Sequence, residues 1–343
     1  IMKSTLRLLF LLSTAACLAQ ESPDPYMADW KGTLTINGKT QPACLFLIPH
    51  GAQHYEAKLV STFDKRVPTL FQLRGRIDDS GFQFVDAIPF EANRVLRATD
   101  DGVVIGASLW SGGGQADSAF GSVAGRRKGS FEIERIQRLS PTLGKQPPAG
   151  AVVLFDGRSL APWRPRDPNA GEVKWKLVEG GAMQVHGGDI ITRQNFGSFR
   201  LHLEFQLPYM PEARGQGRAN SGVYLQGRYE VQVLDSYGLE GEDNECGGIY
   251  QIARPILNMC APPLQWQTYD ITYTAPKLDA AGKKTANARA TILLNGVVIH
   301  DNLELPRITG GAVDYKEGQP AGILLQDHGN PVRYRNIWIE KLD

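Results

Sequence analysis

The segment Tyr229–Asp235 carries acidic and amide side chains at alternating positions. On a β-strand, Glu230 and Gln232 point to one face and the neighbouring valines point to the other. Asp235 then falls on the valine face, unless a one-residue bulge after Gln232 returns it to the side of Glu230. Paired carboxylates suit cleavage of a glycosidic bond, since one donates a proton while the other acts as base or nucleophile. A polar outer face with Asp235 capping a turn accounts for the same residues equally well.

Two other polar groups stand beside predicted strands. Asn220 and Ser221 precede a short apolar run, where they can bind a sugar hydroxyl or form an ordinary turn. The sequence Gln326-Asp327-His328 lies in a glycine-containing turn, and an Asp–His pair can act as acid and base or have a structural role. Arg335, on the last predicted strand, can pair with one of these carboxylates.

Aromatic side chains in or near predicted loops offer faces on which sugar rings stack, with core packing as the alternative for some of them. They are Trp163, Trp175, Trp266, Tyr209, Tyr237 and Tyr250. The acidic loop 240–245 lacks the ligand spacing of an EF-hand, so a solvated loop is the favoured interpretation. His50 and His54 are interpreted as surface residues. The sequence therefore shows no convincing set of metal ligands, and the cofactor stays unknown, with a divalent metal as the open option.

Short apolar runs separated by turn residues continue along the chain, which contains 37 glycines and 21 prolines in 343 residues. This pattern predicts an all-β protein built from antiparallel strands. Asn295-Gly296 lies between two apolar runs and predicts a tight hairpin. The strands are expected at 32–36, 43–48, 55–61, 82–85, 103–106 and 131–136, and then at 200–207, 224–234, 269–274, 290–294 and 335–342.

Residues 141–150 include two consecutive prolines beside glycine, and they predict a stiff linker. This linker would separate a small all-β domain of unknown role at 24–140, a barrel or sandwich, from a two-sheet sandwich at 151–343.

Residues 1–19 place Lys3 and Arg7 before an apolar stretch that is too short to span a bilayer. This pattern predicts a cleaved export signal and a periplasmic or extracellular protein, with lipid attachment at Cys17 as the less favoured alternative. The formal net charge of +1, without a basic stripe, gives no indication of a nucleic-acid partner. In an exported protein, Cys246 and Cys260 can form a disulfide, or they can remain free thiols. The oligomeric state is not predicted.

Residues 149–343 resemble the 3-keto-disaccharide hydrolase family through an ordered series of short motifs. Each motif is weak alone, and their combination in this order is specific. The one departure is Trp266-Gln267, where relatives commonly have Trp-Asn. The motifs are residues 153–157 with Leu160 and Trp163, 188–190 with Thr192, 199–205, 220–224, 229–236, 248–250, 266–270, 295–296, 325–329 and 332–339.

This resemblance implies a concanavalin A-like jelly roll with a concave sugar-binding face, and cleavage of glycosides already oxidised to a ketone at C3. Removal of the acidified C2 proton, expulsion of the C1 substituent and addition of water then require a base, an acid and donors for the ketone. The proposed base is Glu230, the acid is Asp235 or His328, and the substrate-binding residues are Asn220, Ser221, Gln232, Tyr250, Gln326, Asp327 and Arg335.

Two alternatives remain open for the second domain, and a role in surface assembly is a third alternative that concerns the N-terminal domain. A conventional glycosidase with two carboxylates would act on unoxidised glucosides. A non-catalytic carbohydrate-binding protein would bind the sugar without turnover. The fold does not decide between this alternative and an enzyme, because lectins share it.

Overall fold

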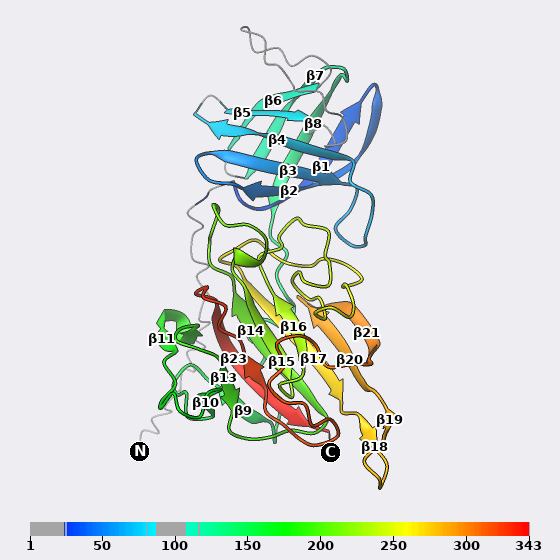
Figure 1. Cartoon of the computed structure of the whole chain (residues 1–343). Coiled ribbons are helices and arrows are strands. Elements are labelled where there is room, and N and C mark those ends of the chain that lie inside the picture. Colours follow the sequence, from blue (N-terminus) through cyan, green and yellow to red (C-terminus); the bar gives the residue numbers. More distant parts are fainter. Residues whose placement is uncertain (1–23, 25, 80, 87–107, 116, 343) are drawn as a thin grey trace, which may run out of the picture.

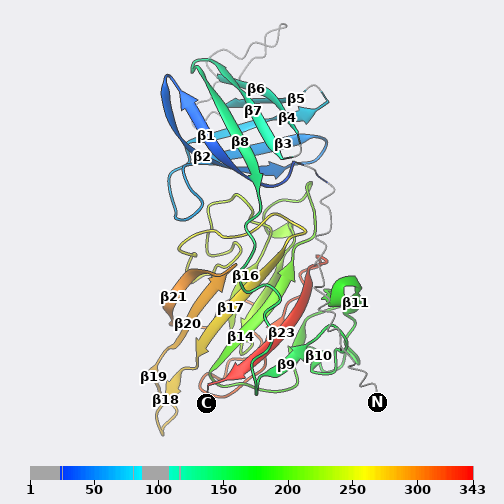
Figure 2. The same ribbon diagram turned by 180° about the vertical axis from the view of Figure 1, so that it is seen from behind.

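The computed structural model describes residues 24–342 except 25, 80, 87–107 and 116. A closed β-barrel forms one end of the molecule and a β-sandwich forms the other (Figures 1 and 2). The expectation of an all-β protein with a C-terminal sandwich is confirmed, and of the two alternatives for the preceding domain the structure shows the barrel. The proposed export signal and the predicted strand at 103–106 lie outside the described residues. No helix in the described part of the chain is long and apolar enough to cross a membrane.

Eight antiparallel strands form the barrel, each paired with the next, and the last pairs with the first. Alternation places Trp30 and Leu34 of the first strand inside. The strands are β1 (Asp29–Ile36), β2 (Lys39–Pro49), β3 (His54–Val60), β4 (Phe71–Asp78), β5 (Gly81–Asp86), β6 (Ser108–Gln115), β7 (Ser118–Gly125) and β8 (Gly129–Ile136).

The sandwich has a smaller and a larger sheet. The smaller one has the spatial order β10 (Trp163–Pro165), β13 (Ile190–Thr192), β22 (Leu324–Leu325), β15 (Ser221–Leu225) and β16 (Tyr229–Val233). The larger one has the order β11 (Lys176–Val178), β12 (Ala182–Gln184), β23 (Arg333–Lys341), β14 (Phe199–Gln206), β17 (Trp266–Thr274), β20 (Ala288–Leu294) and β21 (Val297–Leu305), and β9 (Val152–Phe155) pairs with β23. A separate hairpin joins β18 (Lys277–Leu278) to β19 (Lys284–Ala286), and two 3₁₀ turns lie at η1 (Glu179–Gly181) and η2 (Gly215–Gly217).

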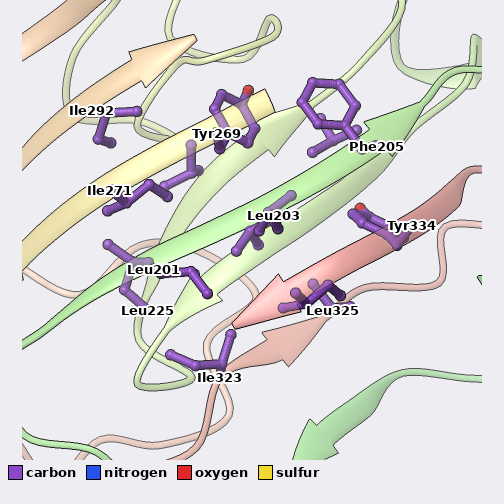
Figure 3. Close-up of a cluster of buried hydrophobic side chains, with 14 of the residues drawn as sticks. Leu201, Leu203, Phe205, Leu225, Tyr269, Ile271, Ile292, Ile323, Leu325 and Tyr334 are labelled. Atoms are coloured by element: carbon purple, nitrogen blue, oxygen red, sulfur yellow. The ribbon is translucent and has the colours of Figure 1, made fainter. Parts of the chain in front are cut away.

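The two sheets bury one continuous apolar core between them. Figure 3 shows Leu203 of β14 and Tyr334 of β23 near Leu225 and Leu325 of the smaller sheet. The predicted alternation of β14 is correct, because Leu201, Leu203 and Phe205 belong to this core. Because side chains alternate along a strand, the residues between those of the core point outward from the sandwich.

The expected strand at 224–234 is wrong in one respect, since the chain turns back between β15 and β16. Gln226 and Gly227 have positive φ angles of 54° and 63°, which produce a hairpin at this point. The hairpin at Asn295-Gly296 is confirmed, with φ angles of 52° and 78°.

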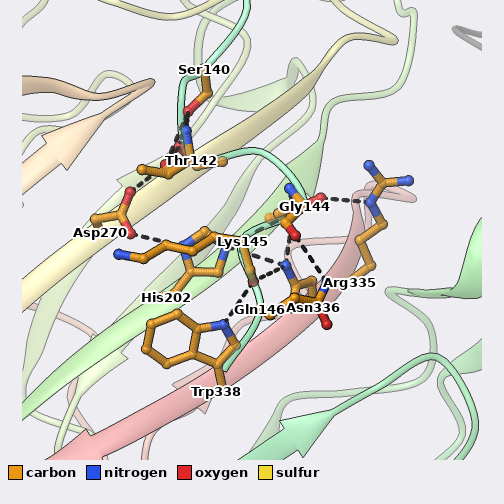
Figure 4. Close-up of polar contacts among 12 residues, drawn as sticks. Ser140, Thr142, Gly144, Lys145, Gln146, His202, Asp270, Arg335, Asn336 and Trp338 are labelled. Carbon is orange, nitrogen blue, oxygen red and sulfur yellow. Dashed lines mark hydrogen bonds and ion pairs between the residues drawn. The ribbon is translucent and has the colours of Figure 1, made fainter. Parts of the chain in front are cut away.

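Residues 140–146, here called the covering segment, lie across the outer face of the larger sheet (Figure 4). The Thr142 hydroxyl donates to Asp270 Oδ2 at 2.6 Å, and the Gly144 backbone N–H donates to Glu204 Oε1 at 2.6 Å. This part of the predicted linker is therefore packed against the sandwich. It explains why β14 is buried on both faces.

The barrel and the sandwich also contact each other directly. Arg66 of the β3–β4 loop donates to four backbone carbonyls of the sandwich loops, those of Glu240, Gly241, Pro255 and Ile256. The Tyr237 hydroxyl donates to the carbonyl of Ala28, just before β1. Arginine bonds and a buried tyrosine at this contact hold the two parts in a defined orientation.

The described cysteines are free and buried. Cys246 and Cys260 are close enough for their thiols to hydrogen-bond, but they form no disulfide in this structure. Among the alternatives left open by the sequence, the structure shows free thiols.

Candidate functional site

Glu230 lies on edge strand β16 and projects from the outer face of the smaller sheet. It stands opposite Tyr224 of β15 in the strand register, while Gln232 stands opposite Gly222. A Cβ atom added at Gly222 would lie only 2.5 Å from Glu230 Oε1. Glycine at this position therefore makes room for the carboxyl group.

The Glu230 carboxyl group is held in an environment that disfavours its charge. The side chain is buried, with the residue only 3% exposed. Burial raises the pKa of Glu230 to about 7, and the negative charge of Asp189 adds to the rise, while a hydrogen bond with Tyr224 opposes it. A carboxyl group with this pKa is able to accept or donate a proton near neutral pH.

Four neighbours complete what we call the Glu230 cluster: Tyr224, Gln326, Asp189 and Arg166. The Gln326 amide donates to the Tyr224 hydroxyl at 3.3 Å, and Arg166 pairs with Asp189 at 3.0 Å. The Oε1 atom of Gln326 is buried and has no hydrogen-bond partner among the described residues. An acceptor in this state is available to a ligand donor such as a sugar hydroxyl.

Asp327 supports this cluster from the turn after β22. Its backbone N–H donates to Asp189 Oδ1 at 2.8 Å, and its own carboxylate accepts from the Gly188 N–H at 2.7 Å. These bonds fix the loop that carries Asp189 beside β22. Asp327 therefore orients Asp189.

Asn220 and Gln232 form an amide pair at the end of the β15–β16 hairpin. Gln232 Nε2 donates to Asn220 Oδ1 at 2.7 Å, and Asn220 in turn donates to the Gln216 carbonyl. Ser221 points the other way, toward the larger sheet, where it accepts from the Tyr334 hydroxyl at 2.7 Å. The amide pair is thus on the side of Glu230, and the Ser221 hydroxyl is in the interior.

Asp235 is completely buried beside a positive charge. Arg218 Nε donates to its carboxylate at 2.6 Å, and the Tyr237 backbone N–H is a second donor. Burial raises the pKa of Asp235, while Arg218 lowers it. β15 and β16 pair residue by residue as far as Val233, without the proposed bulge. The structure therefore brings Asp235 to Arg218, and among the described residues the partners of its carboxylate are Arg218 and the Tyr237 backbone rather than Glu230.

His328 and Tyr250 lie at the margin of the site. His328 is exposed in the turn after β22, two residues beyond Gln326. Tyr250 is half-buried, and its backbone N–H donates to the Glu230 carbonyl at 3.3 Å. His328 is therefore connected to the cluster through the chain that links it to Gln326, and Tyr250 through its backbone hydrogen bond to Glu230.

Arg335 lies on the opposite side of the sandwich, on the outer face of the larger sheet. It donates to Glu204 Oε2 at 2.7 Å and stacks on the Trp266 ring at 4.0 Å. Figure 4 shows the same face with His202, which contacts Asp270 at 2.8 Å. The covering segment completes this network with hydrogen bonds to Asp270 and Glu204. Both sheets of the sandwich lie between the network and Glu230.

The sequence interpretation did not select Asp189, Arg166 or Tyr224 as site residues. Gly188-Asp189-Ile190 and Tyr224 do occur within the resemblance motifs, which is the signal that could have identified them, whereas Arg166 lies outside those motifs. Among the described residues, no group of three or more His, Cys, Asp or Glu side chains is arranged to hold a metal ion.

The residues that form the sandwich match a known family. A family described as the 3-keto-alpha-glucoside-1,2-lyase-like domain matches residues 150–340, which include every member of the Glu230 cluster. The chain belongs to this family. The barrel strands β1–β8 lie before the residues matched to the 3-keto-alpha-glucoside-1,2-lyase-like domain.

Solved structures of Parabacteroides distasonis proteins resemble a part of the chain. One candidate glycosyl hydrolase is 36% identical, with a TM-score of 0.52, and the match covers 57% of this chain and 86% of that protein. A second candidate glycosyl hydrolase of that organism is 21% identical, with a TM-score of 0.43, over 57% of this chain and 95% of that one. No curated protein matches the chain.

Proposed function

We propose that the sandwich cleaves 3-keto-glycosides and that Glu230 is the base that starts the reaction. The supporting observation is a buried carboxyl group whose pKa is raised to about 7, beside a tyrosine hydroxyl and a buried amide oxygen. Membership of the 3-keto-alpha-glucoside-1,2-lyase-like family, and a 36%-identical relative named as a candidate glycosyl hydrolase, support carbohydrate processing as the general activity.

The proposed reaction begins at the carbon next to the ketone. The Glu230 carboxylate takes the C2 proton, and the C–H electron pair forms the enolate of the C3 ketone. The enolate then reforms the ketone as the C1–O bond breaks, which leaves a C1–C2 double bond and a protonated leaving group. Water adds to C1 while a proton returns to C2, so the overall change is hydrolysis.

The neighbouring groups divide the remaining tasks. Tyr224 and Gln326 are proposed to orient the substrate, and the Asn220–Gln232 amide pair to bind its hydroxyl groups. For the acid that protonates the leaving oxygen we favour His328, because it is exposed while Asp235 is paired with Arg218 inside the protein. Arg335 is proposed to hold the covering segment through Glu204 rather than to contact substrate.

Asp189 gives specific support to a second candidate function. It is a second carboxylate whose charge acts on Glu230, and two neighbouring carboxylates are the machinery of a conventional glycosidase. This function predicts release of aglycone from unoxidised glucosides.

The deciding experiment incubates purified protein with matched glucosides, one unoxidised and one with a ketone at C3, with and without chelator. We expect aglycone release from the keto substrate only, and a loss of about 100-fold or more in Glu230→Gln with binding retained. The control is Glu179→Gln, an exposed glutamate of η1, which should keep full activity. Equal turnover by Glu230→Gln would eliminate the proposed base, and binding without turnover by the unmodified protein would indicate a lectin.

We also propose that the protein is exported, on the basis of the charged and apolar pattern of residues 1–19. Its proposed partner is a carbohydrate substrate. A fractionation experiment that finds the full-length chain in the cytoplasm would contradict export.

A further inference from the structure

The barrel encloses a cavity of about 470 Å³, remote from the Glu230 cluster. Its walls are aliphatic and aromatic, and they include Trp30, Ala43, Leu47, Ala57, Phe84 and Trp110. A barrel of eight strands is just wide enough either to be filled by its own side chains or to hold one small ligand. In this barrel the side chains of the described residues leave the interior unfilled.

Glycines on neighbouring strands explain why the aromatic rings leave this space open. Phe84 stands opposite Gly75 in the register, and a Cβ added to that glycine would be 2.7 Å from the ring. Without a Cβ beneath it, the ring can lie against the neighbouring strand rather than point to the barrel axis. The same arrangement recurs in two further cross-strand pairs, Phe82 with Gly112 and Phe131 with Gly121.

Two short side chains enlarge the space further. Ala43 of β2 and Ala57 of β3 point inward at positions where a leucine would fit the alternation of their strands. An apolar cavity of this size weakens a fold, because its walls lose packing contacts. The volume also falls within the range of small-molecule sites, about 300–1,000 Å³.

The lining residues indicate the chemical class of the ligand. Asp78 and Asp79 lie at the end formed by the β4–β5 turn, and the described residues that line the cavity include no lysine or arginine. Carboxylates at one end and apolar walls elsewhere disfavour an anionic ligand such as a fatty acid. We propose that the barrel binds one uncharged, apolar small molecule, as a site separate from the sugar-processing site.

The test uses the full chain and the uncharged fluorescent probe N-phenyl-1-naphthylamine. We expect saturable binding of one probe per chain, with energy transfer from the tryptophans that line the cavity, Trp30 and Trp110. The anionic probe 8-anilinonaphthalene-1-sulfonate should bind at least tenfold more weakly. Absence of saturable binding of the uncharged probe would overturn the proposal, and equal or tighter binding of the anionic probe would overturn the assignment of an uncharged ligand.

Matched leucine substitutions locate the probe. Ala43→Leu and Ala57→Leu place extra volume inside the barrel, while Ala124→Leu places it on the exposed outer face of β7. Each inward variant should weaken probe binding at least tenfold, and Ala124→Leu should leave it unchanged. Unchanged binding by both inward variants would place the probe elsewhere and refute the proposal.

A second measurement applies even where an inward variant fails to fold. The chain has six tryptophans, and Trp110→Phe replaces one of the two in the cavity with another aromatic ring. We expect energy transfer to the bound probe to fall by about half, while Trp266→Phe in the sandwich should leave it unchanged. The opposite pattern would place the probe in the sandwich and refute the proposal.

Discussion

Replacement of Glu230 by glutamine should make the protein more stable at alkaline pH while it abolishes the proposed activity. The pKa of Glu230 is raised from an ordinary 4.5 to about 7, so the native protein binds this proton more tightly than the unfolded chain does. The stabilisation is complete below pH 4.5 and is lost as the pH rises through 7. Glutamine mimics the neutral form at every pH, so Glu230→Gln keeps this stabilisation.

The size of the effect follows from the two pKa values. Between pH 5 and pH 8, ionisation of Glu230 should remove about 2.5 kcal/mol from the free energy of unfolding. The assay is urea unfolding of the unmodified protein and of Glu230→Gln at several pH values in this interval. When the free energies of unfolding of the two proteins are subtracted, the contributions of all other groups that titrate alike in both cancel.

Two outcomes would refute this reasoning. One is a difference between the two proteins that does not change with pH, which would mean that Glu230 has an ordinary pKa. The other is a difference that changes in the opposite direction, which would mean that the native site stabilises the charged form. The control Glu179→Gln, at an exposed glutamate, should follow the unmodified protein at every pH.

Three further predictions concern two buried carboxylates of the sandwich and the buried thiols. Arg218→Met should destabilise the protein by about 3–5 kcal/mol in urea unfolding, because it leaves Asp235 buried without its counter-charge; a loss below about 1 kcal/mol would show that the pair is solvated. The pKa of Glu204 is lowered to about 2, so its stabilisation is present above pH 4.5 and is lost as the pH falls toward 2. Glu204→Gln should therefore lose about 3 kcal/mol at pH 7 and flatten the acid side of the stability profile, and an unchanged acid limb in thermal melts would contradict this assignment. Cys44, Cys246 and Cys260 are buried, so they should react with an aromatic disulfide reagent only after denaturation; immediate reaction of any of them in the native protein would contradict the structure.

The sequence predicted the local geometry of the sheets because that geometry depends on alternation. Glu230 and Gln232 share the outer face, and Leu201 and Leu203 point into the core, as a period of two residues requires. The Asn295-Gly296 hairpin was predicted for the same reason, since its signal is contained in two adjacent residues.

Contacts between distant segments do not follow from alternation along one strand. Asp235 meets Arg218, which lies 17 residues away along the chain, and this pairing depends on how the preceding loop folds. Asp189 reaches Glu230 only because β13 and β15 both pair with β22. Alternation along the strand predicts on which face Arg335 lies. The sheet to which the strand belongs depends on the pairing of β23 with β14, which alternation does not encode.

The covering segment decides where this chain can be divided. A gene fragment that begins at residue 150, at the start of the family match, encodes both sheets but omits residues 140–146. Glu204 and Asp270 would then lose the hydrogen-bond donors that this segment supplies, and His202 would lose its cover. The Trp338 ring would lose the Lys145 carbonyl that accepts its N–H. Joining the sandwich to a different N-terminal domain by recombination should therefore yield a well-folded product only when the crossover falls before Ser140.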